Sequence, residues 1–232
     1  MFKKLIIAAI SASFVASAAF ADSTNVGVRI SGANLAAQGS ETTDLAGGNS
    51  GGAVNTQKER EANFILPSIF IEKQIDMNST GLSMVLGLDF VPLSEEVETL
   101  SGGTGLDAVI KAGNLITAYL QPTFSVNETI SVYGKVGYAT GDLEIDSLKR
   151  QATAASQAND DASTDGATDK TLEGPVYGLG VQMNNDIGIF NFIRLEATRT
   201  DFDEVSHTNS NGKILKADTE MDLITLTIGK SF

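Results

Sequence analysis

Residues 224–232 read ITLTIGKSF, and apolar side chains occupy every second position of most of this stretch. Successive side chains of an extended chain point to opposite faces, so one face of this segment is apolar and the other is polar or small. The apolar face carries Ile224, Leu226 and Ile228, and the stretch finishes on an aromatic residue, Phe232. The pattern predicts a β-strand that lies between an apolar and a polar environment.

The same period of two recurs along the chain and divides it into eight alternating segments. They span residues 25–36, 62–75, 82–93, 113–124, 130–141, 174–183, 189–202 and 220–232. Each has about the 9–11 residues that a tilted strand needs to cross a bilayer, or slightly more. The segments therefore match the length of membrane-spanning strands.

The connections between these segments alternate in length. Short connections cover 76–81, 125–129 and 184–188, and longer ones cover 37–61, 94–112, 142–173 and 203–219. Such alternation is typical of outer-membrane barrels, whose periplasmic turns are short and whose external loops are long. The long connections are polar and low in complexity, and we expect four mobile, acidic external loops. The last one is expected to be largely an extended hairpin that turns at Asn211-Gly212.

The first 21 residues have the composition of a secretory signal peptide. Lys3 and Lys4 precede an apolar run that is rich in alanine and serine, and Ala19-Phe20-Ala21 fits the small-residue cleavage pattern. An N-terminal membrane anchor is the alternative reading. We predict that residues 1–21 are cleaved and that residues 22–232 form one outer-membrane domain.

Composition excludes several classes of protein. The formal net charge of −13, which becomes two units more negative without the signal peptide, disfavours binding to nucleic-acid phosphates. The chain has no cysteine, so disulfides cannot stabilise it. No stretch after residue 21 is long and apolar enough for a membrane helix. We predict an all-β fold, an eight-stranded antiparallel up-and-down transmembrane β-barrel, with a soluble β-sandwich as the alternative.

Charged residues on the polar faces of the strands form a balanced set. The set comprises Arg29, Glu72, Asp89, Lys135, Arg194 and Glu196. Because buried charges must be paired, we expect an ion-pair network across the barrel interior. The network is either a structural plug that fills the lumen or the gate of a narrow conduction path.

Two segments depart from clean alternation. Phe64 and Phe70 fall on the same face as Glu72, and Phe190 and Phe192 fall on the same face as Arg194. A β-bulge or a position near the periplasmic end would explain each departure. Tyrosines on other strands fill the core or form interfacial girdles, and the candidates are Tyr119, Tyr138 and Tyr177.

Across residues 22–232 the chain resembles the small eight-stranded outer-membrane barrels of the OmpA and OmpX type, including opacity-protein-like surface antigens. In that family the last strand ends on an aromatic residue and is read by the barrel-assembly machinery. The matching residues are Ile224, Leu226, Ile228 and Phe232, whereas Lys230 replaces a residue that is usually apolar. The resemblance implies location in the cell outer membrane, among its lipids and lipopolysaccharide.

The single histidine, His207, is the candidate catalytic residue. Some lipid A deacylases are small barrels with a His-x-Ser-Asn stretch, but here Ser210 follows one residue later than in that pattern. A one-residue slip in a strand moves a side chain to the other face and separates a nucleophile from its base. The sequence therefore predicts no enzymatic activity.

Acidic stretches raise the question of divalent cations. Asp161, Ser163 and Asp165 precede Gly166 with the spacing of a calcium loop, but Glu173 comes one position too late to complete it. A second acidic set lies at the expected outer rim, and it comprises Glu95, Glu96, Glu98, Asp201, Asp203 and Glu204. Solvated loops and a solvated rim are the favoured reading, and we predict no metal and no cofactor.

These features together predict a structural or surface-interacting role. A closed barrel would fix the protein in the membrane, and its external loops would meet an extracellular ligand. The alternative is a narrow porin-like channel for ions or small solutes, gated by the interior charges.

Overall fold

The computed structural model describes residues 23–43, 54–56, 60–77, 81–92, 95–101, 107–148, 168–208 and 213–232. Eight long strands are β1 (Ser23–Thr43), β3 (Arg60–Asp76), β4 (Leu82–Val91), β6 (Asp107–Ser125), β7 (Ile130–Leu148), β8 (Thr168–Ile187), β9 (Phe190–Thr208) and β10 (Lys213–Ser231). Two short strands are β2 (Val54–Thr56) and β5 (Glu95–Ser101). Within these ranges no helix is long and apolar enough to cross a membrane.

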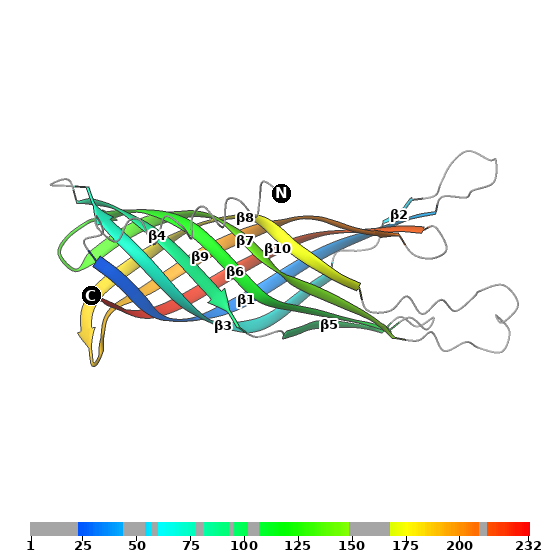
Figure 1. Cartoon of the computed structure of the whole chain (residues 1–232), viewed down its shortest axis with the longest axis horizontal. Helices are drawn as coiled ribbons and strands as arrows, with labels where there is room; N and C mark the ends of the chain where they lie inside the picture. The colour runs from blue at the N-terminus through cyan, green and yellow to red at the C-terminus, as the bar shows by residue number, and fades with distance from the viewer. Residues whose placement is uncertain are drawn as a thin grey trace, which may run out of the picture.

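The long strands form one closed antiparallel sheet (Figure 1). Each pairs with the next long strand along the chain, and β10 pairs with β1 to close the barrel. Two backbone hydrogen bonds between Thr24 and Phe232, of 2.9 and 3.1 Å, fasten the end of this seam. Closure pairs each long strand on both sides through the middle of the barrel, so the backbone groups there find partners within the sheet, as lipid requires. The predicted eight-stranded barrel is confirmed.

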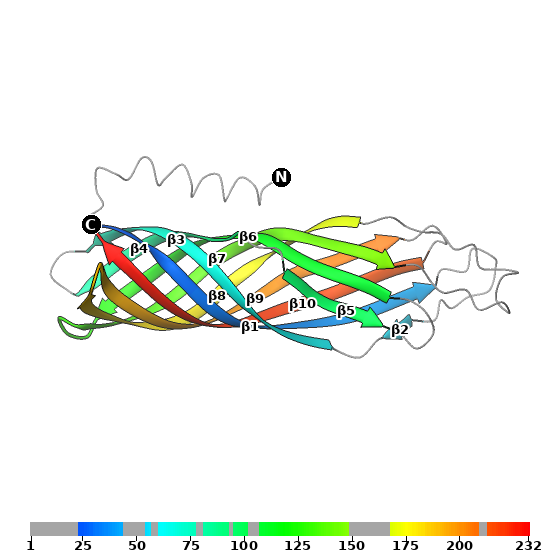
Figure 2. The same ribbon diagram turned by 90° about the horizontal axis from the view of Figure 1, so that it is seen from below.

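Three tight turns lie at one end of the barrel, beside Ser23 and Phe232, and we call this the short-turn end (Figure 2). Gly81 and Gly188 adopt positive φ angles of 71° and 63°, which glycine adopts without steric cost. In the β6–β7 turn, the side-chain oxygen of Asn127 accepts hydrogen bonds from the backbone amides of Thr129 and Ile130. Local turn chemistry therefore reverses the chain at this end.

At the opposite, distal end the strands extend further than the sequence predicted. Pairing of β6 with β7 continues to Asp107 and Leu148, and pairing of β7 with β8 continues to Thr168. Residues 142–148 and 168–173 are therefore strand, and their assignment to a loop was wrong. The alternation was missed because outward side chains beyond the lipid need not be apolar. The predicted β9–β10 hairpin is present as far as Thr208 and Ile214.

The outward face of the barrel carries a continuous ring of exposed apolar side chains, which we call the apolar band. Examples are Val28, Ile69, Leu179, Leu195 and Leu226, which are 45–72% exposed. These residues belong to different strands but lie on the same outward face. Such exposure is unfavourable in water and is expected where the neighbour is lipid.

The barrel interior has two layers of different chemistry. The layer nearer the short-turn end is polar, whereas the distal layer is an apolar cluster that we call the apolar plug. The plug comprises Ala33, Leu35, Leu66, Val91, Ala139, Leu172, Val176, Phe202 and Met221, with Phe64, Leu115, Val205 and Leu223 packed against it. The sequence predicted a polar interior throughout, and this expectation was wrong for the distal layer.

Candidate functional site

The polar layer contains all six charged residues that the sequence singled out. They come from five strands: Arg29 from β1, Glu72 from β3, Asp89 from β4, Lys135 from β7, and Arg194 and Glu196 from β9. Five of the six residues are at most 5% exposed, and only the Asp89 side chain, at 19%, is more accessible. The barrel thus brings three cations and three anions together away from solvent.

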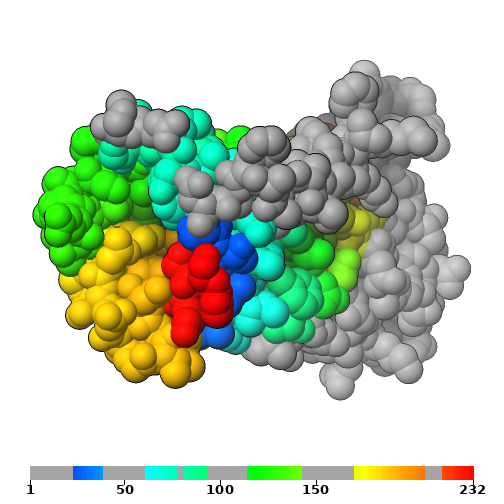
Figure 3. Space-filling view, turned by 60° about the vertical axis from the view of Figure 1, so that its left-hand side comes forward, coloured from blue at the N-terminus to red at the C-terminus, as the bar shows by residue number. Residues whose placement is uncertain are grey.

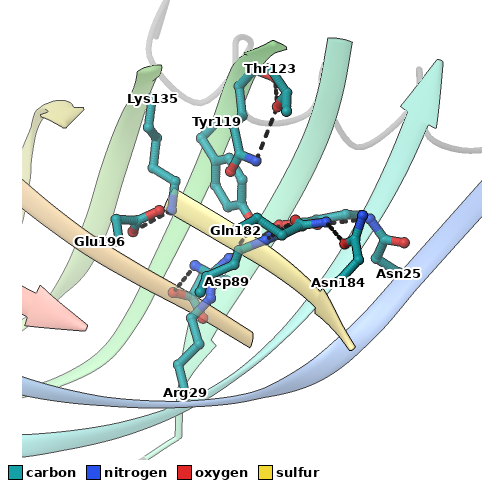
Figure 4. Close-up of polar contacts among 12 residues, drawn as sticks. Asn25, Arg29, Asp89, Tyr119, Thr123, Lys135, Gln182, Asn184 and Glu196 are labelled. Carbon is teal, nitrogen blue, oxygen red and sulfur yellow. Dashed lines mark hydrogen bonds and ion pairs between the residues drawn. The ribbon is translucent and has the colours of Figure 1, made fainter. Parts of the chain in front are cut away.

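Glu72 is the centre of the network (Figure 4). Its two oxygens accept hydrogen bonds of 2.6 and 2.9 Å from both terminal nitrogens of Arg194. The carboxylate also accepts from Arg29 at 3.1 Å, from the Tyr119 hydroxyl at 2.6 Å and from the Asn25 amide at 3.2 Å. This bidentate, multiply bonded arrangement stabilises a carboxylate that is fully buried.

Two further ion pairs complete the network (Figure 4). Arg29 donates to Asp89 at 2.9 Å, and Lys135 donates to Glu196 at 2.5 Å. The ammonium of Lys135 also lies 4.2 Å from the centre of the Tyr119 ring, whose hydroxyl contacts Glu72 and Arg29. Tyr119 therefore connects the two parts of the network, and of the two alternatives left open for it, core filling and an interfacial girdle, the structure shows the first.

The two guanidinium groups are covered by aromatic rings. The carbon centre of Arg29 lies 4.5 Å from the Phe70 ring, and that of Arg194 lies 4.5 Å from the Phe192 ring. The register of β3 is unbroken on both sides, so no bulge places Phe70 inside. The phenylalanines share a face with charges because their rings are cation–π partners of the arginines, and sequence periodicity carries no signal for this contact.

Inward-facing glycines make room for these rings. Four cross-strand pairs place an aromatic residue opposite a glycine: Phe70 with Gly27, Tyr119 with Gly87, Tyr133 with Gly180, and Phe192 with Gly229. A Cβ atom on any of the four glycines would overlap the facing ring. The rings can lie across the lumen only because the neighbouring strand presents no side chain at that position.

A water-sized cavity adjoins the network on its distal side. It measures about 30 Å³ and is lined by Arg29, Asp89, Lys135 and Glu196 among others. One nitrogen of Arg29 and one oxygen of Asp89 have no protein partner among the described residues. The volume is that of about one water molecule, so a water would satisfy these atoms. A second cavity of about 30 Å³ lies within the apolar plug.

The mouth at the short-turn end is wider, at about 550 Å³. Amide side chains line it, including Asn25, Gln74, Gln182 and Asn191. Asn25, one of these lining residues, is 2% exposed, and its side-chain oxygen has no partner among the described residues. Water can therefore approach the network from this end, while the plug covers it from the other.

The outward face carries the remaining residues that the sequence singled out. Ile224 and Phe232 are 61% and 71% exposed, and Leu226 and Ile228 lie on the same face. Tyr177 also faces outward, and its hydroxyl donates a 2.9 Å hydrogen bond to Asp201. Tyr177 thus occupies the position of an interfacial aromatic residue.

The stretches that were considered and set aside as catalytic or calcium-binding lie largely outside the described residues. The backbone of His207 pairs with Leu215, but its side chain and Ser210 are not described. The same holds for residues 161–166 and for the side chains of Glu95, Glu96 and Glu98. In the described part of the chain, no group of three or more acidic or histidine side chains could hold a metal ion.

Comparison with known proteins places this geometry among outer-membrane barrels. The family model described as "Outer membrane protein beta-barrel domain" matches residues 7–229. No curated protein matches the chain.

Several solved structures of other proteins match the chain at low sequence identity. Neisserial surface protein A has 10% identity and a TM-score of 0.46, with 90% of this chain and 97% of that chain covered. Ail, the attachment invasion locus protein of Yersinia pestis, has 13% identity and a TM-score of 0.36, with 89% and 98% covered. The outer membrane protease OmpT of Escherichia coli has 9% identity and a TM-score of 0.40, with 91% and 97% covered.

Proposed function

The chain belongs to the outer-membrane β-barrel protein family and lies in the cell outer membrane. From this premise we propose that the protein is a closed structural barrel, which presents its distal end to other molecules. The filled lumen carries this proposal. Charged and aromatic side chains occupy the polar layer, and apolar side chains occupy the plug. The described cavities within the lumen measure only about 30 Å³ each.

The plug is the main obstacle to conduction. Leu66, Val91, Leu172, Phe202 and Met221 are each 3–8% exposed and converge from different strands. An ion that crossed this layer would lose its hydration without gaining a polar partner. Apolar constrictions of this kind exclude water as well as ions.

The distal end supports a surface role through its exposed charges. Asp222 and Glu220 on β10 pair with Arg199 on β9, and Lys216 pairs with Glu204. These side chains lie beyond the apolar band, where the outer membrane presents lipopolysaccharide and extracellular molecules. In this proposal the distal end carries acidic external loops. These loops would contact lipopolysaccharide and an extracellular ligand.

Single-channel recording tests the closed-barrel proposal. Protein purified from outer membranes would be inserted into planar bilayers after heat-dependent gel mobility has shown that the barrel is folded. We expect a folded, inserted and silent protein. Reproducible discrete current steps would overturn the proposal.

A narrow channel gated by the interior charges is the second candidate. Two features favour it: the wide mouth at the short-turn end and the cavity on the distal side of the network. Glu72 and Arg194 form a thin layer between this mouth and this cavity. If this candidate is right, Glu72→Gln or Lys135→Met would change the conductance. A conducting protein whose conductance is unchanged in both variants would exclude gating by these ion pairs.

Biogenesis forms the last part of the proposal. Residues 1–21 would be removed on export, so N-terminal sequencing of the membrane protein should begin at Asp22. The outward-facing set Ile224, Leu226, Ile228 and Phe232 would be read by the barrel-assembly machinery, and Phe232→Ala should lower the amount of assembled barrel. The proposal assigns no catalytic role to the barrel. The absence of enzymatic activity, which the spacing of His207 and Ser210 indicates, stays a prediction.

A further inference from the structure

The lysine that interrupts the apolar pattern of the last strand has a counterpart two strands away. Lys230 on β10 is paired across the barrel seam with Val26 of β1, and Lys73 on β3 is paired with Thr24 of β1. Neighbouring strands are about 5 Å apart and the two positions are offset by two residues, about 7 Å, along β1, so the lysines flank β1 at a backbone separation of about 12 Å. Figure 3 shows the three segments side by side, with the C-terminal residues in red, β1 in blue and β3 in cyan.

Both lysines lie on the outward face beside apolar residues. Lys73 shares that face of β3 with Ile71, and Lys230 shares that face of β10 with Ile228. Between them, Val26 on β1 is 36% exposed. This three-stranded patch is continuous with the apolar band, so its neighbour is the leaflet at the short-turn end.

The ammonium groups are directed toward the end of β1. Lys73 donates a 2.7 Å hydrogen bond to the Thr24 hydroxyl, and the Lys230 ammonium lies 5.4 Å from the centre of the Phe232 ring. Within the described residues neither lysine forms an ion pair with a carboxylate. Both retain donors for an anionic partner, because an ammonium has three.

The distribution of charge distinguishes this patch from the rest of the barrel. Among the described residues, Lys73 and Lys230 are the outward-facing basic side chains of the short-turn end, whereas Arg29, Lys135 and Arg194 are buried in the lumen. Of the acidic residues of that end, Asp76 is the last residue of β3 and faces the side opposite Lys73, Asp186 lies near the end of β8, and Glu128 lies in the β6–β7 turn. The patch is therefore a local cationic site on an otherwise acidic protein.

We propose that Lys73, Thr24 and Lys230 bind the headgroup of an anionic phospholipid in the leaflet at the short-turn end. The two ammonium groups and the Thr24 hydroxyl would contact the headgroup, while the acyl chains would lie along Val26, Ile71 and Ile228. Lysines at a membrane interface extend their charge toward headgroups while their stems cover apolar surface. An apolar residue at position 230 would suit lipid contact. Lys230 occupies this position, in our proposal, because its ammonium group contacts the lipid headgroup.

Native mass spectrometry tests this site on the barrel purified from outer membranes. The protein would be kept in detergent micelles with equal amounts of phosphatidylglycerol, which is anionic, and phosphatidylcholine, which is zwitterionic. We expect preferential retention of phosphatidylglycerol. Each lysine replaced by glutamine should lower that preference about fivefold, as expected for one basic residue near an anionic surface.

Matched variants separate a charge effect from a folding effect. Lys216→Gln removes an exposed lysine of the distal end, paired with Glu204, and should leave the lipid preference unchanged. Lys73→Arg/Lys230→Arg keeps both charges and should retain it. Equal retention of the two lipids by the unaltered protein would overturn the proposal, as would an unchanged preference in folded Lys73→Gln/Lys230→Gln. Neither result depends on whether the barrel conducts.

Discussion

Arg194 on β9 donates two hydrogen bonds, of 2.6 and 2.9 Å, to the carboxylate of Glu72 on β3. The residues are 122 positions apart in the chain, and their strands are separated in the sheet by β10 and β1. The ion pair therefore crosses the lumen instead of bridging adjacent strands. Such a contact restrains the cross-section of the barrel and depends on correct closure of the whole sheet.

Replacement of Glu72 by glutamine should destabilise the barrel strongly. Arg194 and Arg29 would lose their shared carboxylate, and removal of one partner from a buried ion pair typically costs about 3–5 kcal/mol. The free energy of unfolding, measured by urea titration in lipid vesicles, would report the loss. Glu220→Gln, at a side chain that is 56% exposed, should change it by less than about 0.5 kcal/mol. Similar stabilities for the two variants would contradict the central role of Glu72.

Substitution of Gly27 by alanine should impair closure of the β1–β10 seam. The added Cβ would overlap the Ile228 carbonyl oxygen and lie 2.7 Å from both Gly229 and the Phe70 ring. Overpacking of this kind costs about 1–3 kcal/mol. We expect less heat-modifiable, folded protein on gels. Gly32→Ala on the same strand is the control, because its Cβ would meet no atom within 4 Å; equal yields would argue against steric closure at Gly27.

Deletion of residues 168–173 should disrupt the distal end of the barrel. This segment pairs with β7, and Leu172, which is 3% exposed, belongs to the apolar plug. Deletion of six residues from the connection that precedes β8, such as 155–160, is the control, because it removes none of the described residues that pair with β7. Protease protection of the folded protein should therefore fall only in the first deletion. Equal protection would show that the β8 extension contributes little.

The Arg199–Asp222 pair beyond the apolar band predicts a pH effect. Two hydrogen bonds from Arg199, together with its positive charge, hold the pKa of Asp222 below its ordinary value. Because this pKa is lowered by folding, the contribution of the pair is present above the ordinary pKa and disappears as the pH falls through the lowered one. NMR titration of the Asp222 carboxyl should show the low pKa, and Arg199→Gln should raise it toward the ordinary value. No rise would mean that the pair is not formed in solution.

Periodicity alone was enough to recognise the strands and their faces. The alternation in residues 224–232 identifies the apolar outward face, and the same rule assigns Glu72 and Arg194 to the interior face. The rule fails for Phe70 and Phe192, because it equates apolar side chains with lipid and cannot represent a ring stacked on a guanidinium. It also fails for residues 142–148, since outward side chains beyond the lipid are free to be polar.

The sequence by itself determined the strand count, the outward apolar band and the set of charges inside the barrel. These properties depend on the alternation of side chains along each strand, which is local. Only the tertiary structure decided that Arg194 pairs with Glu72, that Lys135 pairs with Glu196, and that Leu172 and Phe202 close the distal lumen. Contacts across the lumen depend on the register of every strand and on ring closure, which together set the height of each side chain along the barrel axis.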